Sequence, residues 1–218
     1  MLKVKSFVFN AFQENTYVLY DETNTAVIID AGCYEPGEQE ELRSFITDHQ
    51  LQVRQLLNTH GHVDHVLGND FIKRTYNLGP YLHPLDEPVL RSVKTYAPNY
   101  GFHQYSEVLP EGYLAEGDEI IFGHQKMKVL FVPGHAPGHV AFYNEAAKVV
   151  IGGDVLFYNS IGRTDLPGGN YDTLINSIHH QLFTLPDDVT VYPGHGPKTT
   201  IGYEKRNNPY CALTPHQS

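Results

Sequence analysis

The chain has 218 residues, of which 41% are hydrophobic, 18% charged and 12% aromatic, a composition typical of a folded globular protein. Fifteen Lys and Arg against 25 Asp and Glu give a formal net charge of −10, which argues against the basic face that nucleic-acid binding normally needs. No apolar run approaches the roughly 20 residues of a membrane span, and the first residues lack the apolar core of a signal peptide, so we expect a cytoplasmic protein without a membrane partner.

The first half of the chain is predicted to begin with strands and then to alternate strands with helices. The first two strands are separated by five residues, which favours a hairpin-like pair. Leu42, Phe45 and Ile46 recur at helical spacing among charged residues. In chain order we expect strands over 3–10, 16–21 and 26–30, a helix over 38–49, a strand over 51–58, a helix over 67–76, a strand over 80–83 and a helix over 84–96.

The second half contains four short apolar segments joined by tight connections, which predicts antiparallel pairing. These strands are expected over 119–123, 127–132, 140–144 and 148–151, followed by a helix over 171–185 and a last strand over 189–192. No segment is rich enough in Pro, Gly or Ser to act as a linker. We therefore expect one domain over residues 1–218, with mixed sheet covered by helices.

Histidine is the unusual residue of this chain, with 13 copies, and metal binding is its commonest use in such numbers. The segment T-H-G-H-V-D-H at 59–65 holds four metal-competent side chains at the end of a predicted strand. In an extended segment, residues i and i+2 point the same way, so His60 and His62 can share one ion. The turn into the next helix carries Asp64 and His65 towards a second position.

Three later segments repeat the pattern of strand end, glycine and ligand: P-G-H at 133–135, G-G-D at 152–154 and P-G-H at 193–195. Glycine allows close backbone approach there, and a sheet holds the following side chain rigidly. The seven side chains exceed what one tetrahedral ion accepts and suit two ions that share a carboxylate. They are His60, His62, Asp64, His65, His135, Asp154 and His195.

This ordered set of motifs resembles the metallo-β-lactamase superfamily over nearly the whole chain. Asp30, in I-I-D-A-G at 28–32, also matches the first motif of that family, where the aspartate is structural. The resemblance implies an αββα four-layer sandwich with the metals at one sheet edge, whereas periodicity alone predicts only an α+β protein. It also implies two metal positions: His60, His62 and His135 form one, Asp64, His65 and His195 form the other, and Asp154 bridges them.

Two divalent metal ions are therefore the expected cofactors. Zinc is the first expectation, with iron and manganese as alternatives, because histidine and carboxylate ligands accept all three. We expect Asp64 to have a catalytic role as well, as an acceptor that orients the attacking nucleophile.

Two further segments, I-G-R-T-D-L-P-G-G at 161–169 and T-T-I-G-Y-E-K-R-N-N-P-Y at 199–210, resemble small glyoxalase-II-like hydrolases. In glyoxalase II, a basic residue nine positions after the bridging aspartate contacts glutathione, and that position is Arg163 here. An ion pair with Asp165 is the alternative interpretation of Arg163. The chain ends 23 residues after His195, so we expect it to lack the C-terminal helical domain of full-length glyoxalase II.

The sequence thus predicts a metal-dependent hydrolase whose partner is a small-molecule thioester, such as glutathione-derived S-D-lactoylglutathione. A thioester suits such a site because its thiol can leave as a thiolate, whereas an amide leaving group needs an acid. One alternative is a persulfide dioxygenase that holds a single iron with His60, His135 and Asp154, and another is a lactone or ester hydrolase of the same fold. An exported β-lactamase and a non-catalytic interaction module are less favoured.

Overall fold

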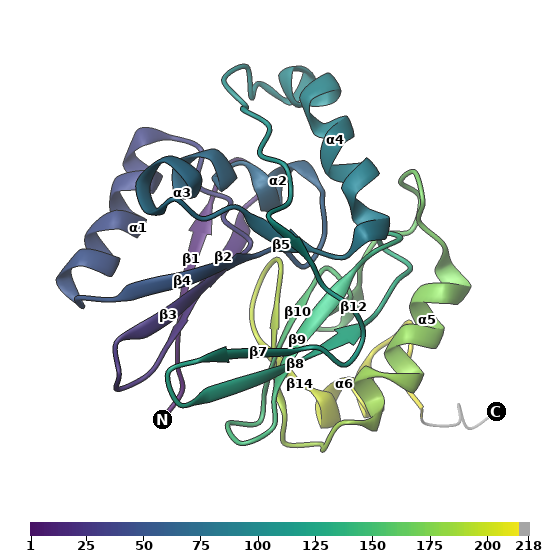
Figure 1. Ribbon diagram of the computed structural model, residues 1–218. Helices are drawn as coiled ribbons and strands as arrows, with labels where there is room; N and C mark the ends of the chain where they lie inside the picture. The colour runs from purple at the N-terminus through teal and green to yellow at the C-terminus, as the bar shows by residue number, and fades with distance from the viewer. Residues whose placement is uncertain (214–218) are drawn as a thin grey trace.

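The computed structural model describes residues 1–213, in which two six-stranded sheets lie face to face between two layers of helices (Figure 1). The first sheet has the order β1-β2-β3-β4-β5-β6, with antiparallel pairing from β1 to β3 and parallel pairing from β3 to β6. Its strands are β1 (Lys3–Phe9), β2 (Glu14–Tyr20), β3 (Thr25–Ile29), β4 (Gln52–Leu57), β5 (Pro80–Leu82) and β6 (Gly112–Tyr113).

The second sheet has the order β14-β13-β10-β9-β8-β7, and only β10 and β13 pair in parallel. The four antiparallel strands predicted in the second half of the chain are therefore present. The strands are β7 (Glu119–Phe122), β8 (Gln125–Phe131), β9 (Val140–Asn144), β10 (Val149–Gly153), β13 (Thr190–Pro193) and β14 (Thr199–Thr200); β11 (Leu156–Phe157) and β12 (Ser160–Ile161) form a separate small ribbon.

Helices cover the outer face of each sheet. In Figure 1, α1 (Pro36–Asp48) and α3 (Asn69–Tyr76) lie beside the first sheet, and α5 (Tyr171–His180) and α6 (Ile201–Asn207) lie beside the second. The remaining helical segments are α2 (Val63–Val66), η1 (Pro84–Asp86), α4 (Glu87–Tyr96), η2 (Ala97–Tyr100) and η3 (Leu182–Thr184). Within residues 1–213, no helix combines the length and apolar character that crossing a membrane requires.

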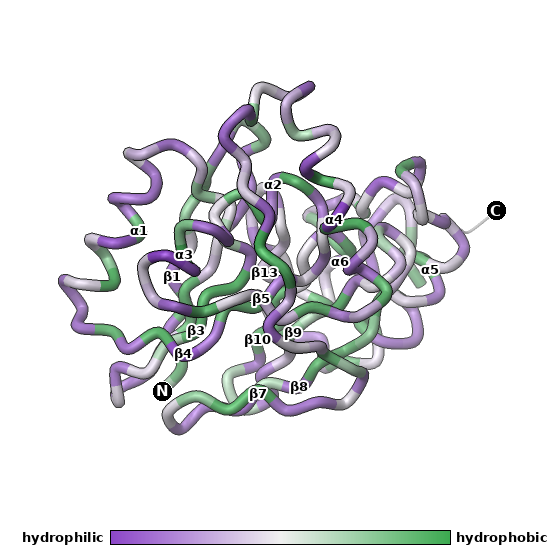
Figure 2. Tube along the Cα trace, turned by 45° about the horizontal axis from the view of Figure 1, so that its top comes forward, coloured by the Kyte–Doolittle hydropathy of each residue, from purple (hydrophilic) through white to green (hydrophobic). Residues whose placement is uncertain are grey.

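Side chains along the central strands alternate between the two faces of each sheet, and this produces three layers of hydrophobic core, one between the sheets and one under the helices on each side. Successive strand residues point to opposite faces, so Leu19 and Val27 pack between the sheets, where they share a cluster with Phe142, while Val18 and Ile28 face the helices. Figure 2 shows apolar residues along the strands and a mixture of polar and apolar residues along α1, as expected for a helix that covers one face of a sheet. The predicted αββα sandwich is confirmed.

Several predicted helices are interrupted. The helix predicted over 67–76 is preceded by α2 and begins only at Asn69, because Gly68 packs against the loop after β3 and its N–H donates to the carbonyl oxygen of Ala31 rather than to the preceding turn. A Cβ at Gly68 would lie 2.6 Å from Cys33 Sγ and 2.8 Å from the carbonyl oxygen of Ala31. The close packing at this point therefore requires a glycine, which separates the two helices.

Proline explains the other two departures. The helix predicted over 84–96 is a 3₁₀ turn, η1, followed by α4, because Pro88 has no N–H for an α-helical bond and its ring would clash with the preceding turn. The helix predicted over 171–185 ends at His180 and continues as the 3₁₀ turn η3. Leu185 is extended there, as expected for the residue before Pro186.

Candidate metal centre

The seven predicted ligands lie together at one end of the two sheets. The segment 60–65 follows the end of β4, His135 follows β8, Asp154 follows β10 directly, and His195 follows β13. β4 belongs to the first sheet and the other three strands to the second, so the site forms where the ends of both sheets meet. The fold therefore brings together segments that are as much as 135 residues apart in the chain.

His60, His62 and His135 form a first group, in which one ligand atom of each lies within 4.8 Å of the others. His62 Nδ1 lies 2.9 Å from His135 Nε2. His60 and His135 are both buried. The trio predicted from the sequence is thus assembled as a triangle of nitrogen donors, which we call the three-histidine trio.

Asp64, His65 and His195 form a second group with the same spacing limit, which we call the aspartate-containing trio. His195 Nε2 lies 3.0 Å from Asp64 Oδ2, and His65 Nε2 lies 3.5 Å from the same oxygen. Both Asp64 and His65 belong to the short helix α2, which carries them to this second group, although the ring of His65 also lies 4.2 Å from that of His60.

Asp154 stands between the two trios. Its Oδ2 lies 3.5 Å from His135 Nε2 in the first trio, and its Oδ1 lies 3.4 Å from His65 Nε2 in the second. The Oδ2 atom is also 3.5 Å from His195 Nε2. One carboxylate therefore reaches donors on both sides, which is the position that the sequence assigns to a bridging group.

The ring nitrogens that point away from the centre are held by the protein. His65 Nδ1 lies 3.1 Å from Asp30 Oδ2, and His135 Nδ1 lies 2.8 Å from the carbonyl oxygen of Arg163. His195 Nδ1 lies 3.1 Å from the carbonyl oxygen of Phe12. Such contacts fix the tautomer and direct the other nitrogen inward, which is the usual arrangement behind metal-binding histidines.

The buried atoms without a partner test whether this site fits a metal. Within residues 1–213, His60 Nε2, His65 Nε2 and Asp154 Oδ1 are buried and make no hydrogen bond. A buried polar group left unpaired costs about 1–3 kcal/mol, so three in one place need a partner. All three face the same centre, and a divalent cation is a partner that satisfies two imidazoles and a carboxylate together. The residues present therefore fit metal ions.

The two trios differ in their charge. Burial, helped by His135, lowers the pKa of His62 to about 3, and burial also lowers the pKa of His60. Burial lowers the pKa of His195 too, but its hydrogen bonds with Asp154 and Asp64 outweigh that effect and raise it to about 10. The three-histidine trio is neutral at pH 7, which is the form of imidazole that binds metal, while the second trio is anchored by carboxylates.

Arg163 is placed beside the site through its backbone, while its side chain points to the surface. Its side chain is 61% exposed, and its guanidinium donates two hydrogen bonds of 2.7 Å to Asp165. The ion pair that the sequence offered as an alternative is therefore present. A role in substrate binding remains a proposal.

Sequence reasoning missed several residues around the centre. Glu14, completely buried, lies with its Oε1 3.9 Å from His65 Nδ1, and Asn10 donates a hydrogen bond to the carbonyl oxygen of Asp64. Asp86 is also buried and receives two backbone hydrogen bonds. None of these positions carries a motif, because their roles depend on contacts with distant segments.

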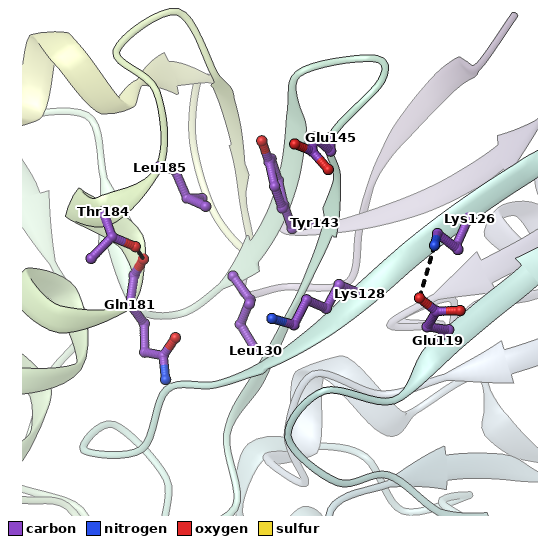
Figure 3. A pocket seen from close by; sticks show the side chains of 9 residues that line it. All are labelled: Glu119, Lys126, Lys128, Leu130, Tyr143, Glu145, Gln181, Thr184 and Leu185. Atoms are coloured by element: carbon purple, nitrogen blue, oxygen red, sulfur yellow. Dashed lines mark hydrogen bonds and ion pairs between the residues drawn. The ribbon is translucent and has the colours of Figure 1, made fainter.

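The hollow shown in Figure 3 lies away from this centre. It is lined by side chains of β7, β8, β9 and the region around η3, including Lys128, Tyr143 and Thr184. None of the seven candidate ligands lines it. The metal centre is thus identified by its donor atoms and not by this hollow.

Comparisons with known proteins agree with this geometry. Residues 9–195, which include all seven candidate ligands, match the family model described as the metallo-β-lactamase superfamily. Hydroxyacylglutathione hydrolase GloC of Haemophilus influenzae is 37% identical over 211 residues, which cover 96% of this chain and 98% of that protein. The crystal structure of the B3 metallo-β-lactamase BLEG-1 superposes with a TM-score of 0.82 at 34% identity, covering 97% and 99% of the two chains. The crystal structure of TTHA1623 in a di-iron-bound form superposes with a TM-score of 0.81 at 37% identity, covering 95% of this chain and 100% of that chain.

Proposed function

The chain belongs to the metallo-β-lactamase superfamily, and we propose that this metallo-hydrolase cleaves a small-molecule thioester such as S-D-lactoylglutathione. The observation that carries the proposal is the position of Asp154, whose two oxygens lie 3.4 and 3.5 Å from histidines of the two trios. Similarity to a hydroxyacylglutathione hydrolase across almost the entire chain supports the thioester as substrate.

In this proposal the two trios would hold two divalent ions. His60, His62 and His135 would hold one, Asp64, His65 and His195 would hold the other, and Asp154, which lies beside both trios, would be shared. Zinc suits these ligands, and the iron bound by TTHA1623 supports iron as an alternative. When bound, such ions lower the pKa of a coordinated water towards roughly 7 and polarise the carbonyl under attack.

The protein's own residues orient the reaction. Asp64, with a side chain 12% exposed, lies where it can accept a hydrogen bond from the attacking water and align it with the substrate carbonyl. The reaction forms a C–O bond and breaks the C–S bond. The sulfur departs as a thiolate with a parent pKa near 8.5, so no side-chain acid has to protonate it first. The products are a carboxylic acid and a free thiol.

We also propose that Arg163 binds the thiol portion of the substrate. Its carbonyl oxygen lies 2.8 Å from His135 Nδ1, so the residue borders the centre while its side chain is exposed. Asp165 already engages the guanidinium through two parallel hydrogen bonds. A substrate carboxylate, such as those of glutathione, can replace Asp165 in the same two-pronged geometry.

The test is thiol release from S-D-lactoylglutathione by metal-loaded protein under anaerobic conditions. We expect release that a chelator abolishes and that Asp154→Asn reduces by at least ~10³-fold, since the bridging carboxylate is lost. His180→Ala is the control, because this exposed histidine lies on α5 outside the centre. Near-normal turnover by Asp154→Asn would contradict the shared-carboxylate site. No release by wild-type protein, together with oxygen uptake on a persulfide, would favour the dioxygenase instead.

A further inference from the structure

Asp86 links two loops that carry candidate ligands, although it touches no ligand side chain itself. It ends η1 and is completely buried. Its Oδ2 accepts a hydrogen bond of 2.5 Å from the backbone N–H of Gly61, and its Oδ1 accepts one of 2.7 Å from the N–H of Gly138. Gly61 lies between His60 and His62, and Gly138 lies three residues after His135.

The two glycines fit tightly around this carboxylate. A Cβ at Gly61 would lie 2.8 Å from the backbone nitrogen of Leu90 and 3.0 Å from the carbonyl oxygen of Asp86. A Cβ at Gly138 would lie 2.6 Å from the backbone nitrogen of Asp86 and 2.8 Å from its Cβ. Close packing thus favours glycine at both positions, where a side chain would push the loop away from Asp86.

Asp86 links the loop that contains Gly61 to the loop that contains Gly138. Together these two loops contribute every member of the three-histidine trio, whereas the aspartate-containing trio also needs His195 from elsewhere. The closest contact between them at the centre, His62 Nδ1 to His135 Nε2 at 2.9 Å, joins one ligand from each loop. His65 and His195 are oriented separately, by Asp30 and by the carbonyl oxygen of Phe12. A change at Asp86 therefore acts on the distance between His62 and His135 more than on the second trio.

We propose that Asp86 is a positioning residue that sets the metal affinity of the three-histidine trio by holding its two loops in register. This inference rests on the proposed metal site. A carboxylate is needed because two N–H donors require two acceptors. An asparagine offers one oxygen and turns its NH₂ group towards the other N–H, which leaves a buried donor unpaired and lets one loop move away.

The test is a titration of metal-free protein with Zn²⁺ in competition with a chromophoric chelator, which reports each affinity separately. For Asp86→Asn we expect one site to weaken by ~10–100-fold while the other keeps its wild-type affinity. Glu204→Gln is the matched control, because Glu204 is also a buried carboxylate whose two oxygens accept hydrogen bonds, from Thr199 and Asn208, but lies outside the centre. It should lower thermal stability and leave both zinc affinities unchanged.

A purely structural role would not separate the two sites. If Asp86→Asn binds two zinc ions as wild type does, or weakens both equally, the inference is wrong. Gly138→Ala, which crowds the link from the other side, provides a second variant if Asp86→Asn does not fold, and the same selective loss is expected. Failure of the wild-type protein to bind two zinc ions would overturn the proposed function itself, which distinguishes the two failures.

Discussion

At the scale of single residues, the centre is recognised by polar atoms that are buried without a partner. His60 Nε2, His65 Nε2 and Asp154 Oδ1 all face one region. The residues that bear these atoms were predicted from the sequence, because each belongs to a short motif. Among the supporting residues, Asp30, which orients His65, was also singled out from its motif as structural. Glu14 and Asp86 were not, since they approach the centre from segments whose sequence gives no sign of that contact.

The pKa of Asp86 predicts how the stability of the protein depends on pH. Burial, assisted by the charge of Asp30, outweighs the hydrogen bonds from Gly138 and Gly61 and raises the pKa of Asp86 from 3.8 to about 6. The folded state therefore binds this proton more tightly than the unfolded state does. Its contribution to stability is full below pH 4 and is lost as the pH rises through 6, a change of about 3 kcal/mol.

Urea unfolding of metal-free wild-type protein and Asp86→Asn at several pH values from 4 to 7 measures this contribution. The Asn side chain does not titrate, so the stability difference between the two proteins should shift in favour of the variant by about 3 kcal/mol across this range. Tyr96, whose pKa is raised to about 12 chiefly by burial, stays neutral throughout and does not interfere. A difference that is independent of pH would show that the Asp86 pKa is not raised.

At the scale of elements, the centre depends on how strands end. Gly194 follows β13, donates a hydrogen bond of 2.8 Å to the carbonyl oxygen of Gly153, and accepts one from Asn15 in the other sheet. A Cβ at Gly194 would lie 2.0 Å from Asp154 Oδ1 and 2.8 Å from His65 Cε1. The strand end therefore approaches the Asp154 carboxylate so closely that no side chain fits between them.

We predict that Gly194→Ala lowers zinc affinity at least ~10-fold by displacing Asp154 and His65. Gly37→Ala is the control, because nothing lies within 4 Å of a Cβ there and the added methyl favours helix α1. Equilibrium dialysis with metal analysis measures the bound zinc. Unchanged zinc binding in Gly194→Ala would contradict the close approach described here.

Most strands and helices were predicted from the sequence to within a few residues, because their apolar periodicity is strong. The interruptions were missed where a local feature opposed that periodicity, as Pro88 does at the start of α4. The two-residue strands β6, β11, β12 and β14 were also missed, since two residues have no detectable period, and so was the short helix α6. The short strands are defined only by their pairing partners in the folded protein.

At the scale of the whole molecule, periodicity alone predicted a mixed α and β protein but not its layers. The αββα order came from the resemblance of the ligand motifs to one superfamily. The reason is that pairing β3 with β4, or β10 with β13, depends on contacts across the fold and not on local propensity. That residues 1–218 form one domain stays a prediction.

The most direct test of this account follows thiol release from S-D-lactoylglutathione while metal-free protein is titrated with Zn²⁺. Because Asp154 lies between two complete trios, we predict that activity rises until two equivalents are bound and then stays constant. His62→Ala should saturate with less metal and stay well below the wild-type rate. Full activity at one equivalent, or release that needs no metal, would contradict the two-metal thioesterase.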